Sequence, residues 1–201
     1  MSVRVVCAAD VAPQPWRNGA GQTRELLRWP PSAGGSAVGS TPVLRISVAD
    51  IDGDAPFSVF EGVTRWFAVI EGAGVLLRFG AEQRRLARFD PPLCFDGADP
   101  PECLLLGGPT RDLNLMLHRA TGTMVPVQGS TPWQPRFAQC GLFTASAGQW
   151  SCGQERVDLA PMSLLWDDAL SVTRAWQFVS AQPPDQSLAW WLGASPEPID
   201  P

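Results

Sequence analysis

The apolar residues of this chain fall in many short runs, and helical periodicity is rare. The runs are Val3–Cys7, Thr23–Trp29, Leu44–Val48, Trp66–Ile70, Val75–Phe79, Glu102–Leu106, Leu113–His118, Gly141–Ala145, Gln149–Cys152, Met162–Trp166, Ser171–Phe178 and Leu188–Leu192. Turn residues, drawn from 20 Pro and 19 Gly, separate them. Short runs between turn signals are typical of strands. The pattern predicts an all-β sandwich or barrel.

Two segments lack this strand pattern. Pro30–Pro42, PPSAGGSAVGSTP, has the composition of a flexible loop with no means of packing a core. Gly122–Trp133 contains two Pro and is the best candidate for a seam between two halves of the chain.

Composition argues against several classes of function. The net charge is −5 and the isoelectric point about 4.8, which disfavours sequence-independent binding to the phosphates of nucleic acid. All 15 basic residues are Arg, so Schiff-base chemistry at Lys is excluded. No apolar run could cross a bilayer and the first residues lack a signal-peptide core. The five Cys are odd in number and widely spaced, as expected of reduced thiols. We expect a cytoplasmic protein that binds neither nucleic acid nor membrane.

A polar turn precedes one of the predicted strands in Pro15–Glu25, PWRNGAGQTRE. Asn18 is one of only two Asn in the chain, and the dipeptide Asn18-Gly19 favours a turn because both residues tolerate positive φ. The residues that follow are strand-like. We therefore predict a tight polar loop that feeds a sheet and presents Trp16 and Arg17 at its rim.

Two predicted strands each combine one aliphatic face with one polar face. The polar faces carry, in chain order, Arg45, Ser47, Asp112, Asn114, Met116 and His118. These faces could lie in water, as in an ordinary sandwich, or line the lumen of a barrel where Arg and Asn reach a ligand. A solvated face would more often carry Ser, Thr, Glu and Gln, so the choice of residues favours the lumen.

Arg65 precedes Trp66 in an otherwise apolar strand. Its stem could cover apolar surface with the charge in water, or its guanidinium could bind a carboxylate through two parallel hydrogen bonds. Together, Arg17, Arg45 and Arg65 would make a pocket selective for a small anion. Trp16 would supply an apolar wall, as small-molecule sites usually require.

The chain offers little for metal or nucleophilic chemistry. His118 is the only His, so a His-rich metal site cannot form, and a catalytic triad has a single possible base. We predict no metal, no other cofactor and no catalytic residue.

Val69–Gly74, VIEGAG, ends one strand before Val75–Phe79 resumes the next. We predict a hairpin with Gly72 and Gly74 at its turn. With a later turn and the Phe-Asp-Gly that starts at Phe95, this order resembles a cupin barrel.

The motifs taken together resemble the HutD (Ves-like) family, accessory proteins associated with bacterial histidine utilisation. In chain order they are PWRNGAGQTRE (15–25), RISVADIDGDAPFSVFEGVTRW (45–66), VIEG (69–72), FDG (95–97) and RDLNLMLHR (111–119). The resemblance implies a bicupin, two packed cupin-like β-barrel or jelly-roll halves in one compact unit. We place the halves at residues 1–119 and 120–201, with the pocket in the first.

Carried over position by position, the resemblance implies ligand contacts from every motif region except VIEG and FDG. The residues are Trp16, Arg17, Asn18, Gly19, Arg45, Ser47, Asp50, Phe57, Ser58, Arg65, Asp112, Asn114 and Met116. The chain departs from the family pattern at Arg17, where Lys is common, at Leu44, where an aromatic is frequent, and at Ala98, where Asp often follows Phe-Asp-Gly. These changes could retune ligand choice and leave the fold intact.

The leading hypothesis is a metal-free protein that binds a small carboxylate of histidine degradation, of the urocanate or formylglutamate type, and governs that pathway. A homodimer is compatible with the sequence. One rival is a cupin-like isomerase or hydrolase that uses Asp50, Asp112 or His118 as acid or base. Another is an interaction module whose exposed Trp residues bind a protein.

Overall fold

The computed structural model describes residues 3–30, 42–168, 174–183 and 185–196. Most of the predicted loop Pro30–Pro42 and the start of the predicted strand Ser171–Phe178 lie outside these residues. The chain divides into two compact units. We call Val11–Ala120 the pocket unit, and Met1–Asp10 with Thr121–Pro201 the tryptophan unit. No helix in the described ranges has the length and apolar character needed to span a membrane.

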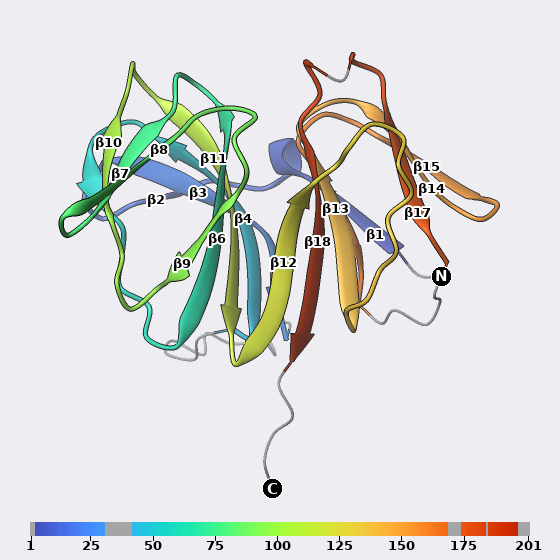
Figure 1. The fold of residues 1–201 in the computed structure, drawn as a ribbon, viewed down its shortest axis with the longest axis horizontal. Helices are drawn as coiled ribbons and strands as arrows, with labels where there is room; N and C mark the ends of the chain where they lie inside the picture. Colours follow the sequence, from blue (N-terminus) through green and yellow to red (C-terminus); the bar gives the residue numbers. More distant parts are fainter. Residues whose placement is uncertain (1–2, 31–41, 169–173, 184, 197–201) are drawn as a thin grey trace, which may run out of the picture. The chain divides into compact units, whose positions relative to one another are not determined.

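The pocket unit consists of two antiparallel sheets (Figure 1, blue to green). The six-stranded sheet has the order β2-β3-β4-β11-β6-β9, and the four-stranded sheet the order β5-β10-β7-β8. The strands are β2 Gln14–Pro15, β3 Gly21–Trp29, β4 Leu44–Ile51, β5 Ala55–Pro56, β6 Val63–Glu71, β7 Val75–Phe79, β8 Glu82–Leu86, β9 Leu93–Asp96, β10 Glu102–Leu105 and β11 Thr110–His118. A core of Phe67, Val69, Val75, Leu77 and Cys103 joins the inner faces of the two sheets.

The predicted alternation on β4 is confirmed and extends further than expected. Leu44 and Ile46 are fully buried on one face, and Ser47 on the other face is 3% exposed. β11 pairs with β4 so that Asn114 lies opposite Ser47, and it pairs with β6 so that Asn114 lies opposite Phe67. The polar faces therefore line the interior of the barrel, not bulk water.

The predicted hairpin at Gly72 and Gly74 is wrong, because β6 and β7 belong to different sheets. The chain crosses from one sheet to the other at this point. Gly72 (φ 96°) and Gly74 (φ 106°) have backbone conformations that disfavour side chains. A Cβ on Gly72 would also lie 2.5 Å from the carbonyl oxygen of Pro109. The glycines thus permit a tight crossover.

The tryptophan unit likewise has two antiparallel sheets, β1-β16-β13-β18-β12 and β15-β14-β17. Its elements are β1 Val3–Cys7, the 3-10 helix η1 Ala8–Asp10, β12 Ala120–Pro126, β13 Gln139–Thr144, β14 Gly148–Cys152, β15 Glu155–Leu159, β16 Ser163–Asp167, β17 Trp176–Ser180 and β18 Ala189–Pro196. The structure thus differs from the division at residues 119 and 120, because β1 pairs with β16 throughout its length. It also places β12 where the sequence suggested a seam.

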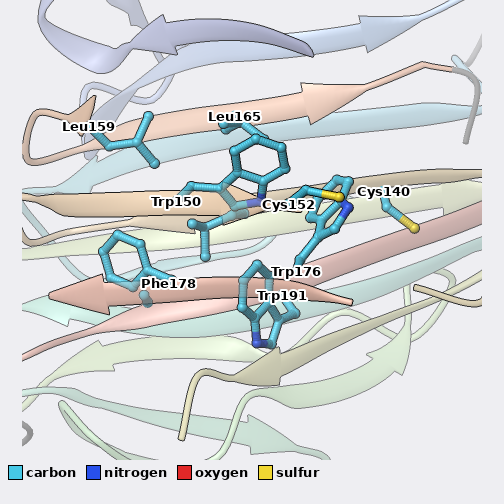
Figure 2. Close-up of a cluster of buried hydrophobic side chains, with 10 residues drawn as sticks. Cys140, Trp150, Cys152, Leu159, Leu165, Trp176, Phe178 and Trp191 are labelled. Atoms are coloured by element: carbon cyan, nitrogen blue, oxygen red, sulfur yellow. The ribbon is translucent and has the colours of Figure 1, made fainter. Parts of the chain in front are cut away.

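Indole rings fill the interior of the tryptophan unit (Figure 2). Trp150 and Trp176 meet edge to face with ring centroids 5.2 Å apart. Trp133 and Trp191 stack in parallel at 5.1 Å. Each such ring buries a large apolar area and adds a directional ring contact. A pocket found in this unit has a volume of only about 90 Å³, so the larger cavity of the pocket unit is the better candidate site.

Candidate ligand-binding site

A cavity of about 520 Å³ lies in the pocket unit. Its wall is formed by the inner faces of β3, β4, β6 and β11 together with residues 14–18 and 56–60. The sequence-predicted residues that line it are Trp16, Arg17, Asn18, Arg45, Ser47, Phe57, Ser58, Arg65, Asn114 and Met116. The structure therefore brings ten of the thirteen predicted positions to one cavity.

The other three predicted residues do not line the cavity. Gly19 takes φ 71° in the rim turn, in agreement with the turn predicted there. Asp50 lies on the outer face of β4, because it alternates with Ser47 and shares a face with Val48. Asp112 is on the inner face of β11 but is fully buried and does not line the cavity.

Arg65 is the dominant electrostatic feature of the site. It is only 6% exposed, and its Nη2 donates a hydrogen bond of 2.9 Å to Oδ1 of Asn114. Its Nε and Nη1 are buried and have no acceptor among the described residues. No ion pair joins Arg65 to a carboxylate of the described chain. Burial, and then the charge of Arg45, lower the pKa of Arg65 to about 10, so it remains a cation at neutral pH.

Aromatic rings surround this guanidinium. Its Cζ lies 4.7 Å from the ring centroid of Phe57, 5.1 Å from that of Phe95 and 5.9 Å from that of Phe60. Ring faces attract a cation but do not neutralise it. The rings also hold the side chain in place, since Phe57 and Phe95 stack on each other at 6.3 Å. The result is an immobilised, unpaired positive charge.

The contact with Arg65 also fixes the amide of Asn114. A guanidinium only donates hydrogen bonds, so the amide must turn its oxygen toward Arg65. The amide nitrogen is then directed away from Arg65, on a side chain that lines the cavity. Arg65 and Asn114 together offer donors of fixed orientation, an arrangement suited to an anion.

Arg45 has a different role from the one expected. Its Nε donates to Glu25 at 2.7 Å, and Glu25 also accepts from Arg28 at 3.1 Å. The charge of Arg45 is therefore shared with a carboxylate of the neighbouring strand. Its Nη1 lies 3.9 Å from the sulfur of Met116. Arg45 shapes one end of the cavity and adds to its positive potential, but it is not an unpaired cation.

The rim loop is held in one conformation by local hydrogen bonds. Trp16 donates from its indole nitrogen to Oγ1 of Thr23 at 2.8 Å. Oδ1 of Asn18 accepts from the backbone nitrogen of Ala20 at 3.1 Å. Arg17 is exposed beside them. These hydrogen bonds fix the rim loop, with the exposed cation of Arg17 beside the cavity.

Asp50 belongs to a network outside the barrel. Its two oxygens accept from Arg111 at 2.6 Å, from Gln22 at 2.9 Å, and from Arg24. Arg111 also pairs with Glu71 at 3.0 Å. Burial raises the pKa of Asp50, but these hydrogen bonds outweigh it and lower the pKa below its ordinary value. Asp50 thus ties neighbouring strands together and, unlike most of the residues predicted as ligand contacts, does not line the cavity.

Several wall residues were missed from the sequence. They are Gln14, Pro15, Thr23, Ala49, Ile51, Pro56, Phe60 and Phe67. Strand alternation could have found some of them, because Ala49 and Ile51 continue the face of Ser47, and Phe67 shares a face with Arg65. Glu25, the partner of Arg45, gave no such signal.

The donor set of the cavity does not suit a divalent metal. Its lining within the described residues includes three Arg but no His, Asp or Glu. Metal ions in proteins are bound mainly by imidazole, thiolate and carboxylate groups, and the arginines would repel a cation. The rival acid–base candidates Asp50, Asp112 and His118 also lie off the wall.

Residues 8–187 match the model of the HutD family. The chain belongs to the HutD family. A 21.2 kDa protein in the hutC 3′ region of Pseudomonas putida is 37% identical over 115 residues, a match that spans only 57% of either chain. Protein Ves of Citrobacter koseri is 26% identical over 92% of this chain and 93% of Ves.

Solved structures of similar proteins cover both units of this HutD-family chain. A conserved protein from Pseudomonas aeruginosa PAO1 is 29% identical with a TM-score of 0.82, covering 97% of this chain and all of that one. HutD from Pseudomonas fluorescens SBW25, in a structure described as the formate condition, is 26% identical with a TM-score of 0.79, covering 96% of this chain and 98% of that HutD. The predicted bicupin fold and family are confirmed.

Proposed function

We propose that the pocket unit binds a small carboxylate whose negative charge is held by Arg65. The observation that carries this is the buried guanidinium of Arg65, which lines the cavity with Nε and Nη1 lacking an acceptor in the described chain. Burying a charge without a partner is costly, and proteins seldom retain one without a function. A bound carboxylate supplies both the countercharge and the missing acceptors.

Other features of the cavity support an organic anion over an inorganic one. Phe57, Phe60 and Phe67 give it a large apolar wall next to the charge, and Trp16 flanks the entrance. A volume of about 520 Å³ exceeds what a bare carboxylate occupies and falls in the range of small-molecule pockets. The ligand therefore has a carboxylate for Arg65 and a body that contacts the rings.

The histidine degradation pathway is the proposed source of this ligand. One relative lies in the hutC 3′ region, and the related HutD from Pseudomonas fluorescens is described in a formate condition, formate being the smallest carboxylate. Urocanate and formylglutamate each have a carboxylate and a polar body. Binding such an intermediate, without converting it, suits a protein that governs flux through the pathway.

Calorimetric titration tests this proposal. Urocanate, formylglutamate, glutamate and formate would be added in turn to the full-length protein, to Arg65→Met and to Arg85→Met, a matched control on exposed β8. We expect at least one acid to bind the wild type and the control equally. Loss of a buried charged contact worth about 2 kcal/mol should weaken binding to Arg65→Met about thirtyfold or more. Equal binding to Arg65→Met, or no binding of any acid to the wild type, would overturn the proposal.

A further inference from the structure

A second buried ionisable group, Asp112, shares the barrel interior with Arg65. β11 carries Asp112 and Asn114 two residues apart on its inner face. Asp112 is fully buried, paired with Ala49 of β4 on one side and Val69 of β6 on the other. Ala49 itself lines the cavity. Asp112 therefore lies in the barrel interior, next to a residue of the cavity wall.

Only one of the two carboxyl oxygens of Asp112 has a hydrogen-bond partner among the described residues. Its Oδ2 accepts a hydrogen bond of 2.7 Å from Oγ1 of Thr110. Its Oδ1 is buried and has no partner among the described residues. No ion pair joins Asp112 to an Arg of the described chain. The barrel interior thus contains a cation without a carboxylate and a carboxyl group without a cation.

The groups around Asp112 favour its neutral form. Its ionisable neighbours are Asp50 on β4 and Cys103 on β10, whereas Asp54, in the segment before β5, acts on Cys103. Each of them is acidic. Arg111, the preceding residue of the strand, is on the outer face and pairs with Asp50.

Burial raises the pKa of Asp112 to about 8, opposed by the hydrogen bond from Thr110 and reinforced by Asp50. The thiol of Cys103, with its pKa raised to about 12, stays neutral at that pH. Among these neighbours, Asp112 is therefore the group that changes charge slightly above neutral pH.

We propose that Asp112 couples anion binding at Arg65 to a proton, so that the ligand is held while Asp112 is protonated and released as it ionises. This inference rests on the proposed function of the cavity. A bound anion and an ionised Asp112 would place two negative charges in one barrel, so each state disfavours the other. Linkage makes the effect reciprocal, because ligand binding must then draw a proton onto Asp112.

The register of the strands sets the size of the effect. Arg65 pairs with Met116, four residues along β11 from Asp112, which is roughly 13 Å at about 3.3 Å per residue. Two like charges at that separation, with an effective dielectric of about 20, change affinity about tenfold. Arg65 stays mostly charged up to about pH 9.5, since its pKa is about 10.

Formate is a suitable probe because it stays ionised throughout the range in question. It would be titrated calorimetrically against the wild type, Asp112→Asn and Asp54→Asn between about pH 6.5 and about pH 9.5. We expect wild-type affinity to fall about tenfold across this range, with proton uptake near pH 8 seen in buffers of different ionisation enthalpy. Asp54→Asn should behave like the wild type, and Asp112→Asn should bind with constant affinity.

Two results would overturn this coupling. One is a pH dependence in Asp112→Asn equal to that of the wild type. The other is the absence of proton uptake by the wild type, a measurement that needs no variant to fold. If either result is found while formate still binds, only the coupling is refuted and the proposed carboxylate site is not. If formate fails to bind at any pH, the proposed site itself is refuted.

Discussion

If Arg65 is kept for a ligand, removing its charge should leave the protein about as stable as before. Arg65→Met tests this, because Met retains an unbranched apolar stem among Phe57, Phe60 and Phe95 while losing the guanidinium. An arginine that holds the barrel together would behave differently. Removing such an arginine would break contacts that the fold needs and would lower the free energy of unfolding.

The structure gives the magnitude of each contribution. The pKa of Arg65 falls from its ordinary value to about 10, and this difference means that the charged form costs about 3 kcal/mol on folding at any pH below about 10. The hydrogen bond to Asn114 returns about 1.5–3 kcal/mol, and the two nearer rings about 0.5–1 kcal/mol each. These contributions nearly cancel. We expect the free energy of unfolding of Arg65→Met to lie within about 1.5 kcal/mol of the wild-type value.

Urea unfolding at neutral pH, followed by circular dichroism, measures this difference. A loss above about 3 kcal/mol, as when a buried structural ion pair is broken, would refute the reasoning and make Arg65 a structural residue. The experiment repeated with a bound carboxylate at a hundred times its dissociation constant should stabilise the wild type by about 2.7 kcal/mol. At the same concentration Arg65→Met, which should bind about thirtyfold or more weakly, should gain no more than about 0.9 kcal/mol.

Three further predictions follow from the same contacts. Asn114→Asp places an internal carboxylate against Arg65, so calorimetry should show carboxylate affinity reduced at least about tenfold; unchanged affinity would contradict the role of the unpaired charge. Gly72→Ala, with its Cβ 2.5 Å from a carbonyl oxygen, should lose more than about 2 kcal/mol in urea unfolding, and Gly80→Ala, with open space, about 1 kcal/mol. Similar losses would argue against the tight crossover. Since the pKa of Asp112 is raised to about 8, wild-type stability should fall as pH rises from about 4 toward 8, because only the unfolded carboxyl ionises there. Asp112→Asn should remove about 1.4 kcal/mol per pH unit of that slope, and parallel pH profiles would contradict it.

Alternation and turn chemistry explain why much of the site could be predicted. Arg45, Ser47 and Asn114 were placed on inner faces by a period of two, which depends only on neighbouring residues. The turn at Asn18-Gly19 follows from local backbone preference in the same way. Such features need no knowledge of distant contacts, and the structure agrees with them.

The features that were missed depend on pairing between distant segments. The match of β1 with β16 joins residues about 160 positions apart, and nothing within Val3–Cys7 indicates that partner. The crossover at Gly72 has the local signature of a hairpin and differs from one only in which sheet the next strand joins. Glu25 pairs with Arg45 across two strands with a bulge, where simple alternation fails.

The outer network centred on Asp50 has a mechanical consequence for recognition. One carboxylate receives side chains from β3 and β11, and Arg111 continues the link to Glu71 of β6. Sliding β3 past β4 would break the bonds from Gln22 and Arg24 to Asp50, and sliding β11 would break those of Arg111 to Asp50 and Glu71. The sheet that forms the cavity wall is therefore stiff. If the cavity binds a carboxylate as proposed, its selectivity would depend on how well each acid fits a cavity of fixed shape.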